Sequence, residues 1–314
     1  MRPLTEQFYI SAIDDATNLN ALDFSSADSS PDNILAQIVR KREVYLFGPR
    51  SCEVWTNSGG AAFPFVRYQG TPIDVGVVGV RAVCRAADTL VWVGQTDRGG
   101  PYVYWMQGFQ PVRISDQFVE QQLQSSTDYT QATIWTYQEA GGEFVCINAP
   151  GLSSTLCWDA STKQWHERAE LVSGAYTPFR VEQHAYFNNV HYVSGGNKLY
   201  RLSRAYHDLA GDPLVRERTW PHLVRPSLEP VSYHGLEVRC TTGDATQGYM
   251  TLEISNDGGN VYGPPLQRSL GAVGQREQRV RWLGLGTCKA GGSRVFRLRT
   301  SSAVPMTIQG ATIS

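Results

Sequence analysis

Short runs of alternating apolar and polar residues, rich in β-branched and aromatic side chains, make up most of the chain. Alternation with a period of two is typical of β-strands that have one buried face. Turn signals separate the runs, including NSGG from Asn57, DRGG from Asp97, EAGG from Glu139 and SGGN from Ser194. The clearest runs are residues 44–47, 53–56, 90–93, 102–106, 144–147, 191–193 and 198–202. The pattern predicts a chain of β-hairpins.

Helical periodicity is confined to two short segments. Residues 32–42 (DNILAQIVRKR) place apolar side chains at helix-like spacing after Asp32, which is a residue type that caps helices. The same residues also fit a strand that enters the next unit. Residues 115–123 (SDQFVEQQL) are the second helical candidate.

The predicted hairpins recur at a regular interval. A strand pair begins near residues 44, 90, 144 and 191, and both these starts and the arginines that follow them are spaced by about 46 to 55 residues. This is the range expected when a four-stranded propeller blade repeats. The arginines are Arg67, Arg113, Arg168 and Arg218. We therefore expect an all-β, β-propeller-like repeat of four-stranded blades: four units, and an N-terminal strand left over from a fifth or incomplete one.

A boundary is predicted where three prolines interrupt strand pairing, within residues 221–230 (PHLVRPSLEP). Beyond it, five further segments alternate like the strands of a small antiparallel domain. We expect residues 1–43 to form an N-terminal strand and connector of the propeller, residues 44–220 its blades, and residues 221–314 a small C-terminal β-sandwich-like module.

Charge is balanced overall but not along the chain. The formal net charge is −1, so there is no global basic field of the kind that drives non-specific nucleic-acid binding. The first forty residues are acidic, whereas the segment from residue 261 to the end is basic. This asymmetry suits contacts between unlike ends of neighbouring subunits.

The cysteines and the apolar runs indicate the compartment in which the protein is assembled. The six cysteines are widely spaced, without a C-x-x-C pair or a histidine at zinc-ligand spacing. We expect them to be reduced strand residues of a protein assembled in a cytoplasm, and we expect no metal site. The N-terminus has no apolar signal core, and no apolar run is long enough to span a bilayer, so we expect no membrane insertion.

Two basic strands are candidate contact surfaces. With period-two geometry, Arg279 and Arg281 share one strand face, and Arg297 and Arg299 share another. Apolar residues occupy the opposite face of each strand. The arginines either form a solvated sheet surface or face a neighbouring subunit or DNA.

SNDGGNVY at residues 255–262 resembles an Asp-box, in which serine and aspartate side chains bond the backbone of a hairpin. Its expected turn residues are Ser255, Asp257, Gly259 and Tyr262, with tyrosine where tryptophan is usual. We predict a structural turn.

No catalytic constellation is visible. WDASTKQWHER, from Trp158, contains Asp159, His166 and Glu167, but its ASTK turn places them in a hairpin and nothing supplies a nucleophile. G-x-S-x-G, H-E-x-x-H, P-loop and dinucleotide motifs are absent from the sequence. We expect a non-enzyme without a cofactor.

The chain resembles the packaged-DNA stabilisation proteins of short-tailed bacteriophages. The resemblance covers nearly the whole sequence, and its short motifs keep their order and spacing. The matching stretches are FYISAIDDATNLNALDFSSADSSPDNI from Phe8, LFGPRSCEVW from Leu46, FPFVR from Phe63, WVGQTDRGG from Trp92, PVRIS from Pro111, STLCWDASTKQWHER from Ser154, LEISNDGGNVYG from Leu252 and TIQGATI from Thr307.

The resemblance implies a β-propeller subunit of the tail hub or nozzle, located in the virion after assembly in the host cytoplasm. Such subunits form a homo-oligomeric ring, six-fold in the family, that closes or extends the tail channel and retains packaged double-stranded DNA. Portal or adaptor proteins and distal tail proteins are the implied partners.

One departure concerns the N-terminus, because relatives usually carry a substantial region before the segment that matches Phe8. Either the propeller is shortened, with residues 1–30 completing a sheet alone or across subunits, or another chain supplies the missing part.

Two other interpretations remain. A glycan-binding or sialidase-like propeller would need several Asp-boxes and a central pocket of convergent arginines and carboxylates, and the sequence shows one box. A kelch-type scaffold would carry its glycine pairs at a fixed place, whereas here they shift.

Overall fold

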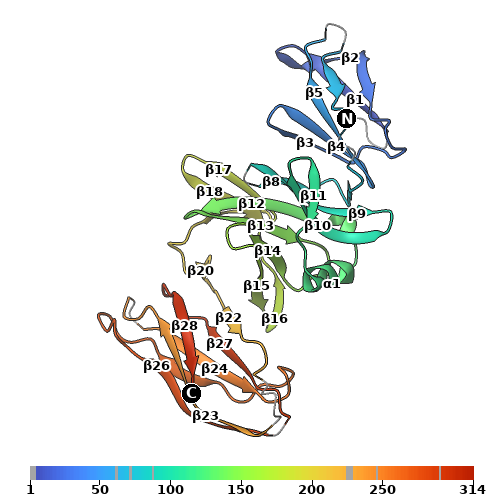
Figure 1. Cartoon of the computed structure of the whole chain (residues 1–314). Coiled ribbons are helices and arrows are strands. Elements are labelled where there is room, and N and C mark those ends of the chain that lie inside the picture. The colour runs from blue at the N-terminus through green and yellow to red at the C-terminus, as the bar shows by residue number, and fades with distance from the viewer. Residues whose placement is uncertain are drawn as a thin grey trace. The chain divides into compact units, whose positions relative to one another are not determined.

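The computed structural model describes residues 5–60, 63–70, 73–86, 88–223, 229–244, 247–289 and 291–314. The chain divides into two compact units, Met1–Leu202 and Ser203–Ser314, and each is described by itself. Antiparallel β-sheets build both units (Figure 1). The prediction of an all-β protein is confirmed.

A hairpin and four successive sheets form the first unit. The hairpin is β1 (Gln7–Ala12) and β2 (Asp15–Ser26). The first sheet contains β3 (Ala36–Arg40), β4 (Glu43–Phe47), β5 (Cys52–Asn57) and β6 (Phe65–Arg67). The second sheet contains β7 (Gly76–Val77), β8 (Val83–Ala86), β9 (Thr89–Thr96), β10 (Gly99–Gln107) and β11 (Gln110–Arg113). The third sheet contains β12 (Thr133–Glu139), β13 (Gly142–Asn148), β14 (Thr155–Asp159), β15 (Gln164–Val172) and β16 (Ala175–Pro178).

The fourth sheet has three strands, in the order β17 (Gln183–Phe187), β18 (Val190–Gly195) and β19 (Lys198–Leu202). The predicted repeat starts at residues 44, 90, 144 and 191 fall in β4, β9, β13 and β18. Each of these strands lies next to an end strand of its sheet. Each repeat that the sequence predicts therefore corresponds to one sheet of the first unit.

The repeating arginines follow the sheets only in part. Arg67, Arg113 and Arg168 lie in β6, β11 and β15, which occupy the fourth position of their sheets. Arg218 does not belong to this series, because it lies in β22 (Arg216–Thr219) of the second unit.

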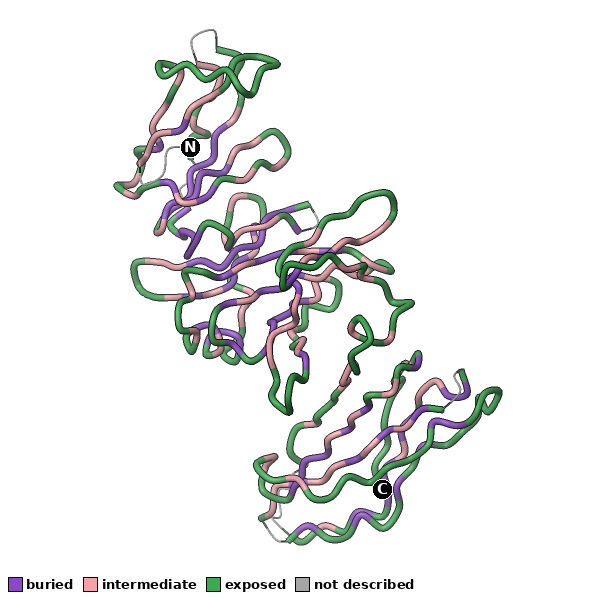
Figure 2. Tube along the Cα trace, turned by 180° about the vertical axis from the view of Figure 1, so that it is seen from behind, coloured by how far each residue is buried: buried purple, intermediate pink, exposed green. Residues whose placement is uncertain are grey.

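Buried side chains pack each sheet of the first unit against the next. Tyr45 and Phe47 of the first sheet, Trp92 of the second and Val145 of the third belong to one core, and the ring centroids of Phe47 and Trp92 are 5.4 Å apart. Another cluster joins the third and fourth sheets, and a third joins the hairpin to the first sheet through Phe8. Burial follows these strand centres, while turns are exposed (Figure 2).

One of the two helical candidates forms a helix, and the other takes the strand alternative that its sequence left open. Helix α1 (Gln117–Ser125) begins after Asp116, whose carboxylate accepts a hydrogen bond from the Val119 backbone N–H at 2.9 Å. Residues 36–40 instead form β3, which is the strand alternative. Asp32 caps no helix, since its carboxylate accepts hydrogen bonds from the Arg50 and Ser51 backbone in the turn after β4.

The second unit is a sandwich of two sheets. One sheet has the order β22-β27-β24-β25 and the other has the order β26-β23-β28. The core between them includes Leu252, Trp282, Phe296 and Leu298. Its strands besides β22 are β23 (Val231–Cys240), β24 (Tyr249–Ser255), β25 (Leu266–Ser269), β26 (Val280–Cys288), β27 (Val295–Thr300) and β28 (Ile308–Ile313). A short hairpin, β20 (Asp208–Leu209) and β21 (Asp212–Pro213), precedes it.

The expected range of the blades, residues 44–220, extends past the point where the structure divides. Strand β22 falls in that range. It nevertheless pairs with β27 and forms an edge strand of the sandwich. Residues 224–228 of the expected proline linker lie outside the described residues.

Trp92 offers a test of how the sheets are held together. It is fully buried, and Trp92→Ala leaves a cavity between two sheets, so the free energy of unfolding of the first unit should fall by about 3–5 kcal/mol. Val80→Ala, at a 66% exposed position of the same unit, is the matched control and should change it by less than about 0.5 kcal/mol. Denaturant unfolding followed by circular dichroism measures both, and equal effects would contradict the packing described.

Candidate interaction surfaces

Arg297 and Arg299 lie on the outer face of the β22-β27-β24-β25 sheet and are paired with carboxylates of that sheet. Arg297 Nε lies 2.7 Å from Glu253 Oε2, and Arg299 Nε lies 3.2 Å from Glu217 Oε2. A further contact of 3.7 Å joins Arg299 Nη1 to Glu253 Oε1. The register that places Glu217 opposite Arg299 and Glu253 opposite Arg297 builds this ladder of alternating charges.

Arg281 lies in β26 of the other sheet, and Arg279 lies immediately before that strand. Arg279 Nε donates to Glu237 Oε1 at 3.1 Å, and its second contact makes the pair bidentate. This hydrogen-bonded pair lowers the pKa of Glu237 and raises that of Arg279. The exposed Arg281 makes no ion pair with any residue that the structure describes.

The two pairs of arginines face opposite sides of the sandwich. Val280 and Trp282 alternate with Arg279 and Arg281 and are buried in the core between the sheets. Phe296 and Leu298 alternate with the other pair and are buried in the same core from the opposite side. Each strand thus has the one buried and one cationic face that its alternation predicts, but the four arginines do not form one patch.

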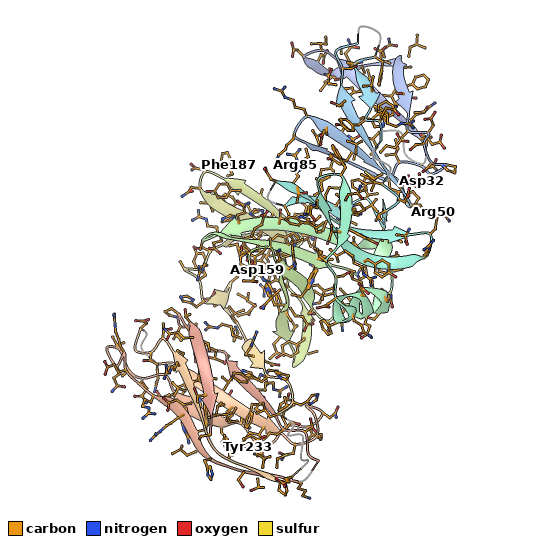
Figure 3. The ribbon with its side chains drawn as sticks, viewed as in Figure 1. Asp32, Arg50, Arg85, Asp159, Phe187 and Tyr233 are labelled. Atoms are coloured by element: carbon orange, nitrogen blue, oxygen red, sulfur yellow. The ribbon has the colours of Figure 1, made fainter. Side chains whose placement is uncertain are left out.

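Arg294 is a structural residue that the sequence interpretation did not single out. It is 3% exposed, and its guanidinium donates to Asn256 Oδ1 and to the carbonyls of Leu285 and Gly286 at 2.9–3.0 Å. Its Cζ also lies 4.8 Å from the ring centroid of Tyr233 (labelled in Figure 3). The sequence held a signal, because Arg294 has the same parity as Phe296 and Leu298 and so points into the sandwich.

The Asp-box segment forms a hydrogen-bonded turn at the end of β24. Ser255 Oγ donates to Asp257 Oδ1 at 2.6 Å and accepts from the Gly259 N–H at 2.9 Å. Asp257 Oδ1 also accepts from the backbone N–H groups of Asn260 and Val261, both at 3.0 Å. The Ser255 hydroxyl and these backbone donors lower the pKa of Asp257.

Tyr262 connects this turn to the charge ladder. The Cζ of Arg297 lies 3.6 Å from the centroid of the Tyr262 ring, so the guanidinium that pairs with Glu253 also stacks on the aromatic face. The turn belongs to the sandwich and not to the first unit, and a sialidase-like propeller would carry its Asp-boxes in the blades. Its hydrogen bonds hold the turn itself and, through Ser293, connect it to the segment before β27.

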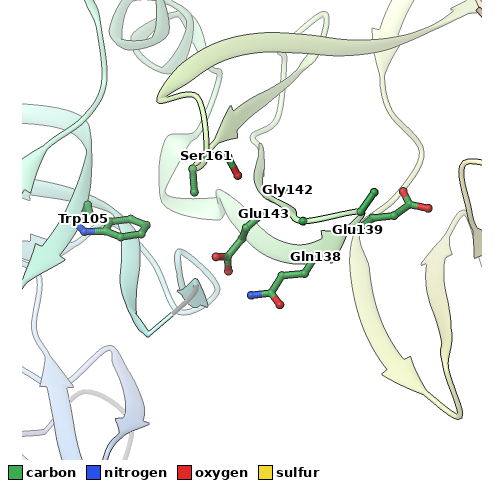
Figure 4. Close-up of a pocket in the computed structure, with 9 residues that line it drawn as sticks. Trp105, Gln138, Glu139, Gly142, Glu143 and Ser161 are labelled. Carbon is green, nitrogen blue, oxygen red and sulfur yellow. The ribbon is translucent and has the colours of Figure 1, made fainter. Parts of the chain in front are cut away.

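A hollow of about 420 Å³ lies beside Trp105 in the first unit. Gln138 and Glu143 point toward it, whereas Glu139 turns to the other side (Figure 4). A glycosidase needs two carboxyl groups that face the same substrate space. Glu139 and Glu143 both line this hollow, but their carboxyl groups point in different directions (Figure 4).

Cys157 immediately precedes the segment that begins at Trp158, and its thiol has a lowered pKa. Burial opposes its ionisation, yet hydrogen bonds from Cys146 and His166 and the charge of Arg168 lower the pKa of its thiol. The Sγ atoms of Cys146 and Cys157 are 3.5 Å apart, and both residues are fully buried. A substrate cannot reach this thiol, so it is part of the packing between the third and fourth sheets.

Two histidines attach the fourth sheet to the third. His184 Nε2 and His191 Nδ1 are 2.9 Å apart, and Tyr137 of the third sheet lies within 6.1 Å of both rings. Burial and the neighbouring His191 both lower the pKa of His184.

Three absences hold for the described part of the chain. No three histidine, cysteine or carboxylate side chains gather there as metal ligands. None of its helices is long and apolar enough to cross a membrane. The six cysteines form no disulfide.

Comparison with protein families decides where this architecture belongs. Residues 3–206 match the family model described as "Bacteriophage P22 Gp10, beta-propeller", and residues 218–314 match "Bacteriophage P22 Gp10, beta-sandwich". The chain belongs to the P22 Gp10 family. It is therefore a bacteriophage structural protein with a β-propeller domain and a C-terminal β-sandwich, as the resemblance of the sequence to packaged-DNA stabilisation proteins predicts.

Other comparisons add no argument to the Gp10 assignment. Comparison with curated proteins gives no match. Among solved structures, a glycoside hydrolase matches at 9% identity and a TM-score of 0.18, covering 90% of this chain and 84% of that one. The WD40 domain of SCAP from fission yeast matches at 9% identity and a TM-score of 0.29, covering 95% and 80%. Sucrose-6-phosphate hydrolase from Lactobacillus gasseri matches at 9% identity and a TM-score of 0.24, covering 88% and 94%.

The histidine pair predicts that the fourth sheet weakens in acid. Because the fold lowers the pKa of His184, the unfolded state binds its proton first, so stability is lost as the pH falls below 6.5 toward the folded pKa. Hydrogen exchange of the β17 and β18 amides, corrected for intrinsic rates, should accelerate between about pH 7.5 and pH 5. His184→Gln should remove this acceleration, and an unchanged pH dependence in that variant would contradict the assignment.

Proposed function

We propose that the protein is a subunit of the tail hub or nozzle of a short-tailed phage. There it assembles as a homo-oligomeric ring, six-fold as in the implied family, that closes or extends the tail channel and retains packaged double-stranded DNA. Portal or adaptor proteins on one side and distal tail proteins on the other are its expected partners. The match of both family models, in order along the chain, supports this proposal most strongly.

The balance of charges agrees with a channel component. A protein that grips DNA neutralises many phosphates with unpaired lysine and arginine side chains. Here Arg279, Arg297 and Arg299 each pair with a glutamate of their own sandwich, and the net charge is −1. A protein with such a surface retains DNA by blocking the channel and not by binding the phosphates. The DNA can then pass through the channel during infection.

Deletion of the gene tests the retention role directly. Particles that lack the protein should package DNA and then lose it, giving empty heads and no infectivity, and supply of the protein in trans should restore both. Quantitative PCR of nuclease-treated particles measures the retained genome. Stable, DNA-filled particles without the protein would refute the proposal.

Arg279 and Arg281 test whether the β26-β23-β28 sheet faces a neighbouring subunit or DNA. Arg279→Glu combined with Arg281→Glu should impair ring assembly or genome retention, since it places negative charge against carboxylates or phosphates. Lys163→Glu, in the exposed β14–β15 turn, is the control. Normal virions from the double variant would show that this face is a solvated surface.

A further inference from the structure

The fourth sheet has one covered face and one open face. Val193, Tyr200 and Leu202 pack against the third sheet. The alternate residues of the same strands point the other way, and among them Phe187 is 73% exposed and Leu199 is 70% exposed. Figure 3 shows Phe187 at the tip of the β17–β18 hairpin. Phe187 lies at one end of this face and Leu199 at the other, and exposed apolar side chains on one sheet face are typical of an interaction site.

The same sheet ends in an unprotected edge. The three preceding sheets have four or five strands, whereas β19 is the last of three, with no further strand paired to it among the described residues. Such an edge presents unpaired backbone groups. Lys198 and Arg201 lie on β19, and residues 183–202 contain no aspartate or glutamate.

The β1–β2 hairpin, at the other end of the series of sheets, has matching properties. Phe8 fixes one face of its base to the first sheet. Two of its apolar side chains are open to solvent, since Leu19 is 62% exposed and Leu22 is 81% exposed. Residues 5–26 contain four acidic residues and no lysine or arginine: Glu6, Asp14, Asp15 and Asp23.

We propose that the open face and edge of the fourth sheet of one copy bind the exposed β1–β2 hairpin of a second copy. The partner is another copy of this chain, because the two surfaces are both apolar and carry opposite charge. The contact joins unlike surfaces at opposite ends of one series of sheets, so it repeats head to tail and can close a ring. This contact depends on the proposed function in one respect: the assembly that it builds is the ring proposed above.

Two blocked variants of the full chain test this contact. The hairpin variant carries Leu19→Asp and Leu22→Asp, and the sheet variant carries Phe187→Asp and Leu199→Asp. All four positions are more than 60% exposed, so folding should be preserved. Because both variants add negative charge, the two altered surfaces repel each other when the variants are mixed. The control carries Val80→Asp and Val261→Asp, at positions that are 66% and 69% exposed and outside both surfaces.

Size-exclusion chromatography with light scattering reads the outcome. The wild-type chain and the control should assemble at high protein concentration, and each blocked variant alone should be monomeric. An equimolar mixture of the two variants should give heterodimers and nothing larger, because one intact hairpin and one intact sheet surface remain.

Three results would overturn the proposal. A variant that assembles like the wild type would place the ring contact elsewhere. A mixture that stays monomeric would show that the hairpin closes on its own chain or that another segment occupies the sheet. A wild-type chain that is monomeric at every concentration would remove the contact altogether. The retention role is judged separately, by the DNA content of particles that lack the gene.

Discussion

Packing of each sheet's buried face against the next sheet is the constraint on which the first unit depends. Strands with a period of two can bury apolar side chains on both faces only when a sheet stands on each side. The clusters around Phe8, around Phe47 and Trp92, and around Trp135 meet this condition in turn along the chain. The condition ends at the fourth sheet and at the outer surface of the hairpin. Those two surfaces therefore expose apolar residues that a stable assembly has reason to cover.

The second unit buries the apolar faces of its strands within itself, because its two sheets pack over a single core. Arg297 and Arg299 lie outside that core, and Glu253 and Glu217, set opposite them in the sheet register, match their charges. The buried Arg294 and the Asp257 turn add hydrogen bonds that connect the strands and loops of the sandwich.

Much of the fold could be predicted from the sequence because its signals are local. Hairpin spacing located one strand in each of the four sheets, and the apolar parity of residues 279–282 and 296–299 placed their arginines outside a core. The rest depended on tertiary pairing, which overrides such local signals. Residues 36–40 have helix-like apolar spacing, yet β4 offers them a partner strand. Arg218 fitted the repeat by distance along the chain but pairs with β27, about eighty residues away in sequence. The partners of Arg279, Arg297 and Arg299 depend on such long-range register, which spacing alone does not reveal.

The central claim is that copies of this chain form a ring around the DNA channel of the phage tail. A cryo-electron microscopy map of the purified virion tests it most directly. The account predicts copies of the chain arranged around the channel below the portal, with the fourth sheet of each against the β1–β2 hairpin of the next. Absence of the chain from the virion, or copies that do not surround the channel, would contradict it.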